Sequence, residues 1–319
     1  MADEENVVEE KIVIDYDLID ETTGFKKAEI DIWTKFEEMM AKPEADRPDV
    51  DTWIDEFCEE AKFDKKRVKF VTTVGIYAGP RDEFNQRSGS GKSIYANGDV
   101  YEGDFFEGKK HGIGQYLFKK LGRSEVDKLI EKLWTNKPES QSNEEFVAQT
   151  AKAIKVGPSI VEHVLEYGFF PCYHGDYARG LRVGQGVMKN KDASVYKGDW
   201  KDNKRHGQGI FYYLNGDMYS GQWSEGQKNG FGTYRFADGS EYRGEWVKGN
   251  FVQGQWIMKD GTYFEGKFDK KNRPCDESGS MHFPRNGISM VGVFQKGRWA
   301  PLNELTVSNE APVEDGWSA

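Results

Sequence analysis

Along much of the chain, large aromatic residues alternate with polar ones, and glycines recur at fixed places in the alternation. The segment "YKGDW" starts at Tyr196, "YSGQW" at Tyr219 and "YRGEW" at Tyr242, so the starts are 23 residues apart. Alternate residues of a strand point to the same face. Each segment therefore predicts a strand that places its two rings and its glycine on one face and its polar side chains on the other.

Weaker copies extend this repeat in both directions. Further units start at Tyr77, Tyr101, Tyr173, Phe264 and Met290, which makes eight units with two poor ones at the ends. A second strand is predicted in each unit, with a glycine pair and a following turn that favours the positive φ angles of tight hairpins. These turns are the Asn-Gly and Asp-Gly pairs at 97–98, 215–216, 238–239, 260–261 and 286–287.

The repeat predicts a mostly β fold, an elongated single-layer antiparallel sheet of hairpins over residues 71–120 and 167–299. One hairpin cannot bury its own aromatic face, so only the stacked array is expected to be stable. The glycines leave space beside the large rings of neighbouring strands. We expect the aromatic core to consist of Tyr101, Phe105, Tyr196, Trp200, Tyr219, Trp223, Tyr242 and Trp246.

Residues 121–166 interrupt the repeat with apolar residues at helical spacing. The first predicted helix has Ser124 as its N-cap, a second covers "SNEEFVAQTAKAI", and a third runs from Pro158 to about Tyr167. Two interpretations are open for this insertion. It is a lid over bare aromatic surface, or it docks to a partner through Leu129 and Leu133.

Residues 1–70 form an acidic arm with 22 acidic and 11 basic residues, whereas the remainder holds 32 and 33. The segment 7–19 predicts a strand or a segment ordered by a partner. Two amphipathic helices are predicted over 29–41 and 49–63. Their apolar faces are candidates for partner docking through Trp33, Phe36, Trp53 and Phe57. The tail at 300–319 is expected to be an extended acidic tether.

The charge distribution argues against nucleic acid as a ligand, because neither the acidic arm nor the neutral body matches a phosphate backbone. The three cysteines, Cys58, Cys172 and Cys275, lack metal-ligand spacing and favour a reducing compartment. The N-terminal residues do not resemble a secretory signal, and no apolar run approaches the roughly 20 residues of a membrane span. We expect no catalytic residues, no metal and no cofactor.

One short stretch resembles a phosphate-binding loop. It is Gly89-Ser90-Gly91-Lys92-Ser93, but the first glycine of a complete loop is replaced by Gln86. Aligned with the unit that starts at Tyr196, Gly89 and Gly91 coincide with Gly207 and Gly209, and Lys92 coincides with Ile210. We therefore interpret this stretch as a repeat strand.

The aromatic segment, polar turn and glycine pair together resemble the MORN repeat, over about residues 73–120 and 167–299. The resemblance implies a scaffold without catalysis, most similar to the radial spoke head MORN proteins of the ciliary axoneme. The expected location is then the cytoplasm, within the cytoskeleton of a cilium or flagellum. The expected partners are other axonemal or radial spoke proteins, or a second copy of the chain in a homodimer.

The alternative function that the repeat suggests is a cortical, membrane-proximal scaffold that binds phosphoinositides. Basic residues recur at equivalent turns and could form a strip that meets anionic lipid headgroups. The residues of this lipid-facing strip are Lys109, Lys110, Lys204 and Arg205.

Replacement of Lys92 tests the repeat interpretation of the phosphate-loop-like stretch. Because Lys92 occupies a strand position, neither ATP nor GTP should raise the melting temperature of the protein, and Lys92→Ala should bind its partners like the wild type. Thermal melts with and without nucleotide provide the measurement. A shift of several degrees that disappears in the variant would contradict the repeat assignment.

Overall fold

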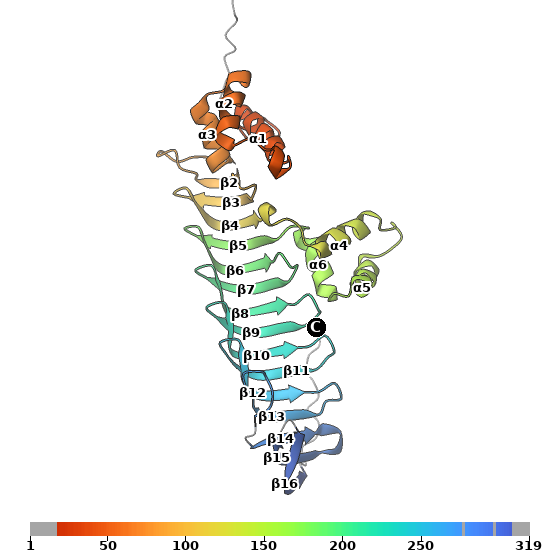
Figure 1. Ribbon diagram of the computed structural model, residues 1–319. Helices are drawn as coiled ribbons and strands as arrows, with labels where there is room; N and C mark the ends of the chain where they lie inside the picture. The colour runs from red at the N-terminus through yellow and green to blue at the C-terminus, as the bar shows by residue number, and fades with distance from the viewer. Residues whose placement is uncertain (1–17, 276–277, 296–297, 308–319) are drawn as a thin grey trace, which may run out of the picture. The chain divides into compact units, whose positions relative to one another are not determined.

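The computed structural model describes residues 18–275, 278–295 and 298–307 (Figure 1). The chain divides into two compact units, residues 1–120 and 121–319. Most of the segment predicted at 7–19, and the end of the acidic tail, lie outside the described residues.

The first unit contains three helices followed by four antiparallel strands in sequence order. The predicted helices over 29–41 and 49–63 are confirmed within two residues at each end. The elements are α1 (Lys27–Met40), η1 (Glu44–Asp46), α2 (Val50–Ala61), α3 (Lys65–Val74), β1 (Ile76–Ala78), β2 (Gly89–Ile94), β3 (Val100–Phe106) and β4 (Lys109–Leu117), with η2 (Lys119–Leu121) after them.

Helix α3 was not predicted. The carboxylate of Asp64 accepts the backbone N–H of Arg67 as an N-cap, and Val68 and Val71 are fully buried. Both signals are present in the sequence, an N-cap residue followed by apolar residues three apart. These signals were missed because the first turn of the segment is rich in basic residues and its end is rich in β-branched residues, neither of which favours a helix at that place.

The three helices share a core with β1, and this corrects part of the docking prediction. Trp33 and Phe36 are buried in that core, so a partner cannot reach them. Trp53 and Phe57 are partly buried against the same core and stack on each other at 5.0 Å between ring centroids. The apolar stripes of the arm therefore hold its own helices together.

The second unit contains three helices and twelve antiparallel strands in sequence order. The elements are α4 (Glu125–Thr135), α5 (Asn143–Ile154), α6 (Pro158–Tyr167), β5 (Cys172–Ala178), β6 (Leu181–Lys189), β7 (Val195–Lys201), β8 (Lys204–Tyr212), β9 (Met218–Ser224), β10 (Gln227–Arg235), β11 (Glu241–Val247), β12 (Asn250–Ile257), β13 (Tyr263–Lys267), β14 (Ser278–Phe283), η3 (Pro284–Asn286), β15 (Ile288–Gln295) and β16 (Arg298–Val307).

The fold-class prediction is confirmed. The strands in the described residues pair as eight antiparallel hairpins, and the first strand of each hairpin contains one of the eight predicted repeat starts. Lys92 lies in strand β2 of the first hairpin, and a strand rather than a helix follows. The array reaches further than predicted, because β16 runs to Val307. The beginning of the expected tether at 300–319 is therefore part of the sheet.

The turns differ in one respect from the prediction. In the Asn97-Gly98 turn, only the glycine has a positive φ, and the side-chain oxygen of Asn97 accepts the N–H of Asp99. Pairs of positive φ angles occur instead at the other turn of the unit, such as Asp202 and Asn203. These two-residue turns match the twist of the flanking strands, so the tight hairpin lies between the strands of one unit.

The insertion forms a small three-helix core of its own. Ser124 is the N-cap of helix α4, as predicted, and it forms a capping box with Asp127. Helix α5 begins with a second capping box. Ile130 of α4, Phe146 of α5 and Val161 of α6 meet in the core. The sequence placed all three helices because their caps and apolar spacing are local features.

A buried ion pair joins the insertion to the sheet. The Lys189 ammonium lies 2.7 Å from the Asp127 carboxylate, and neither side chain is exposed. The same ammonium donates to the carbonyls of Gly168 and Phe170. Further contacts, from Gly157 to the Leu214 carbonyl and from His163 to the Tyr212 ring, lie at the turn edge of β8.

Loss of the Lys189 ammonium should destabilise the second unit strongly. Lys189→Met leaves the Asp127 carboxylate buried without its partner, which costs about 3–5 kcal/mol. The free energy of unfolding in denaturant titrations measures the effect. Addition of Asp127→Asn should restore part of the loss, and the exposed Lys191→Met is the matched control. Equal stability of the two methionine variants would refute a structural role for the pair.

Candidate functional site

A continuous row of glycines crosses the strands of the second unit. Each glycine pairs directly with the next, from Gly175 in β5 to Gly266 in β13. Gly209 shows why the row is needed. A Cβ there would overlap the ring and hydroxyl of Tyr196, which lies directly over the backbone. The absence of side chains at the glycines therefore leaves a flat backbone surface against which the aromatic rings pack.

Two hydrogen bonds to backbone carbonyls hold the rings against the glycine row. The Tyr196 hydroxyl donates to the carbonyl of Asp199 at 2.9 Å, and the indole N–H of Trp223 donates to the carbonyl of Gly209 at 3.1 Å. Equivalent indole bonds join Trp200 to Gly186 and Trp246 to Gly232. The polar tips of these rings are thus satisfied by the backbone.

The rings themselves form a ladder from one repeat to the next. Tyr196 lies edge-to-face against Trp200 of its own strand and against Trp223 of the next unit, both with centroids 5.3 Å apart. Seven of the eight predicted core residues are buried. The eighth residue, Tyr242, is half-buried. Its ring stacks on Phe251, and its hydroxyl donates to the backbone carbonyl of Asn272 rather than to a carbonyl of its own strand.

Basic side chains lie on top of the aromatic ladder at one register. The guanidinium of Arg182 lies 4.6 Å from the centroid of Trp200, that of Arg205 lies 4.4 Å from Trp223, and the ammonium of Lys228 lies 4.1 Å from Trp246. The Arg205 guanidinium is further fixed by a bond to the Gly226 carbonyl. Cations over ring faces are attracted by the ring quadrupole. In the next repeat, Phe251 occupies the position that these basic residues hold in theirs.

Arg182 and Arg205 border a groove of about 800 Å³, which we call the array groove. Arg182, Arg205, Trp200 and Phe211 form its aromatic and cationic wall. Burial lowers the pKa of both arginines from its ordinary value, since the charged form loses hydration. Among the described residues, Arg182, Arg205 and Lys228 have no carboxylate ion-pair partner.

The residues of the predicted lipid-facing strip differ in exposure. Lys110 and Arg205 are half-buried over aromatic rings, with the Lys110 ammonium 4.3 Å from the centroid of Tyr116. Lys109 and Lys204 precede them in their strands and are exposed. Lys204 pairs with Glu225. Lys204 nevertheless lines the array groove together with Arg205.

Arg182 was missed by the sequence analysis. It follows the turn of its repeat, as Arg205 and Lys228 do, and this shared position in the repeat could have identified it from the sequence. In residues 1–120, the first compact unit, Arg87 and Lys110 hold the same position in their repeats. The Arg87 guanidinium donates to the Gly108 carbonyl, just as Arg205 donates to Gly226.

The docking candidates on the insertion are accessible. Leu129 and Leu133 lie one turn apart on α4, and both are exposed. They remain available to a partner, unlike Trp33 and Phe36 of the arm.

Comparison with known families agrees with this geometry. The family model of the MORN repeat matches residues 83–100, 101–123, 173–194, 196–218 and 219–241. The chain carries MORN repeats. Three further hairpins, which contain the repeat starts Tyr242, Phe264 and Met290, lie beyond the matched segments and continue the same strand order. No curated protein matches the chain significantly.

MORN repeats in general build scaffolds that bind membranes or other proteins, and the family is in general non-enzymatic. Within the described residues, no group of three or more His, Cys, Asp or Glu side chains is arranged to hold a metal ion. The helices in the same residues are too short or too polar to cross a membrane.

The buried ammonium of Lys228 should give the array a distinctive pH dependence. Burial, reinforced by the nearby Arg205, lowers the pKa of Lys228 to about 8, whereas an unfolded lysine titrates near about 10.4. Between these values the unfolded state binds more protons, so stability rises with pH. The free energy of unfolding of wild type relative to Lys228→Met should therefore increase from about pH 8 to about pH 10. Parallel pH profiles for the two proteins would contradict it.

Proposed function

We propose that the protein is a non-catalytic scaffold that binds an acidic segment of a partner protein in the array groove. The observation that carries the proposal is the row of fixed cations without carboxylate partners. Arg182 and Arg205 are held in place by rings and carbonyls, so little side-chain entropy is lost when a carboxylate binds. Arginine and aromatic side chains are also the residues that dominate binding energy at protein interfaces.

The exposed face of α4 supports a second contact with a partner. Leu129 and Leu133 present adjacent apolar side chains beside an ordered helical core. A scaffold that binds through the array and the insertion could hold two partners, or two parts of one partner.

The finer proposal is a place in a ciliary or flagellar axonemal complex such as the radial spoke head. Its support is the MORN array itself, with no catalytic family indicated, together with the resemblance to the MORN proteins of that complex that was inferred from the sequence. Axonemal proteins or a second copy of the chain are the proposed partners. This assignment requires the array to be rigid, and the glycine–ring packing favours rigidity.

The alternative proposal, a membrane-proximal scaffold that binds phosphoinositides, has weaker support. Lys109 is exposed, but Lys204 is paired with Glu225, and Lys110 and Arg205 lie over rings. Three of the four basic side chains are therefore already engaged within the protein, which leaves less charge for lipid headgroups.

Loss of the two groove arginines should release the partner. Full-length Arg182→Gln/Arg205→Gln should be depleted from axonemes in a co-sedimentation assay, with affinity reduced by about tenfold or more, since each charge-assisted hydrogen bond is worth about 1.5–3 kcal/mol. Cross-links from the wild type should map to the array groove. Lys197→Gln/Lys201→Gln is the matched control, because it removes two exposed charges from the same repeats.

The remaining outcomes separate the alternatives. Unchanged sedimentation of a folded arginine variant would refute the groove as the docking surface. Loss only in Leu129→Ser/Leu133→Ser would place docking on the insertion. Binding to vesicles with anionic lipids, but not to axonemes, that requires Lys109 and Lys204 would favour the membrane scaffold.

A further inference from the structure

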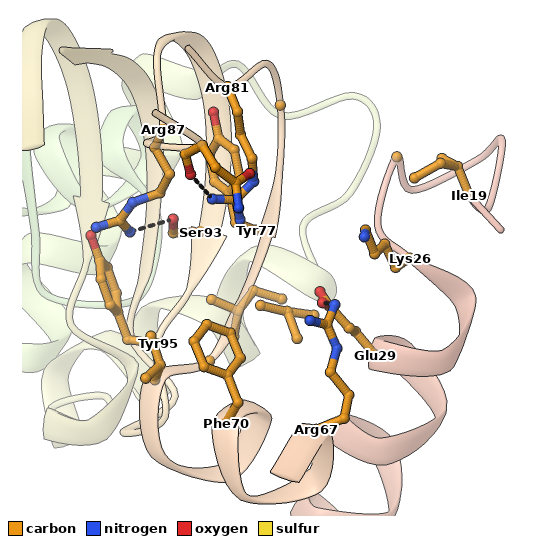
Figure 2. A pocket seen from close by; sticks show the side chains of 17 residues that line it. Ile19, Lys26, Glu29, Arg67, Phe70, Tyr77, Arg81, Arg87, Ser93 and Tyr95 are labelled. Atoms are coloured by element: carbon orange, nitrogen blue, oxygen red, sulfur yellow. Dashed lines mark hydrogen bonds and ion pairs between the residues drawn. The ribbon is translucent and has the colours of Figure 1, made fainter. Parts of the chain in front are cut away.

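A second concave site lies in the first unit, apart from the MORN array groove. It has a volume of about 580 Å³ and is lined by residues from the start of α1, from α3, from β1 and from the following loop (Figure 2). We call it the α3–β1 pocket. Pockets of about 300–1,000 Å³ are typical of small-molecule sites. None of the residues that line the array groove lines this pocket.

Two arginines on the strand side are fixed without a carboxylate. The Arg81 guanidinium donates to the Asn85 carbonyl at 2.8 Å and lies 5.1 Å from the centroid of Tyr77. The Arg87 guanidinium donates to the Ser93 hydroxyl and lies 6.0 Å from the same ring. Figure 2 shows the two arginines on either side of Tyr77. No ion pair of either arginine occurs among the described residues.

Among the described residues, the carboxylate that lines the pocket and the one that adjoins Arg81 in the chain are already occupied. Glu29, the one carboxylate in the pocket lining, is buried and paired with Arg67 of α3. Asp82, next to Arg81 in the chain, accepts the backbone N–H groups of Phe84 and Gln86. The Arg87 guanidinium also donates to the Gly108 carbonyl, so its remaining N–H groups and those of Arg81 are the donors for a ligand.

The strand side of the pocket carries positive charge. Arg67 is paired with Glu29, and Arg81 and Arg87 contribute two further charges to the lining. Such a charge favours a ligand with several negative charges over a single carboxylate. Guanidinium forks match phosphate oxygens in geometry, and a phosphate group carries about two charges at neutral pH.

We propose that the α3–β1 pocket binds an organic ligand that bears phosphate-ester groups. The guanidinium groups of Arg81 and Arg87 bind the phosphate oxygens, and Ser93 orients Arg87. The volume is far larger than one inorganic ion requires, so the phosphate is part of a larger molecule. Lys92 of the P-loop-like stretch is not involved, because it pairs with Glu102 and does not line the pocket. Ser93 of the same stretch lines the pocket and contributes through its hydrogen bond with Arg87.

The same chemistry is found in two sources, a soluble phosphorylated polyol and a phosphorylated lipid headgroup. The rim of the pocket bears on this choice. Phe70, Val74 and Ile19 line it and are about half-exposed. A soluble ligand makes no use of these apolar side chains, whereas a membrane would bury them.

The test uses the full-length protein and two probes. Inositol hexakisphosphate is titrated in a calorimeter, and sedimentation is measured with phosphatidylcholine vesicles with and without phosphatidylinositol phosphate. Arg81→Gln should weaken binding of the effective probe by about tenfold or more, the value of one charge-assisted hydrogen bond. Arg81 is exposed, so the fold should survive, and an unchanged melting temperature verifies this.

Lys109→Gln is the matched control, since it removes one exposed charge from the same unit outside the pocket. Selective weakening by Arg81→Gln supports the proposal, and sensitivity of vesicle binding to Phe70→Ser identifies the lipid source. Equal weakening by both variants would show diffuse charge attraction and overturn it. Absence of binding to both probes would also overturn it.

These outcomes do not depend on the scaffold function. Arg81 and Arg87 belong to the first unit, whereas the groove arginines belong to the second. A protein that sediments normally with axonemes but binds neither probe refutes only the pocket.

Discussion

The close approach of tyrosine rings to glycine backbone is the constraint on which the MORN array depends. A Cβ at Gly209 would occupy the space of the Tyr196 ring. With that space open, the ring lies on the strand, its hydroxyl reaches a carbonyl, and the next tryptophan packs against its edge. Because each ring contacts the following unit, the hairpins stabilise one another and none of them buries its face alone.

The cations follow from the same packing. A ladder of edge-to-face rings presents ring faces at regular intervals, and each face attracts a positive charge. Arg205 and Lys228 occupy two of these places, whereas Phe251 fills the next and closes the cationic row with an apolar contact. The same register thus holds an apolar ring in one repeat and a cation over a ring in another. That difference cannot be seen in a repeat consensus, which treats the position as a variable turn residue.

The helical parts show where local signals suffice and where they mislead. Ser124 and Pro158 marked helix starts correctly, because caps act through the neighbouring backbone. The aromatic stripe of the arm predicted its helices but not their partner. Trp33 and Phe36 pack against α3 and β1, and a helix face has the same pattern whether its partner is its own chain or another protein.

The sequence by itself determined the MORN hairpins, their order and the aromatic core, since a period of 23 residues with strand alternation leaves little choice of fold. Only the tertiary structure decided the rest. It placed Lys110 over rings and left Lys109 exposed, paired Lys189 with Asp127 across 62 positions, and gathered Arg81 and Arg87 around one tyrosine. Charge, burial and pairing of a side chain depend on neighbours distant in the chain, and the sequence does not record that proximity.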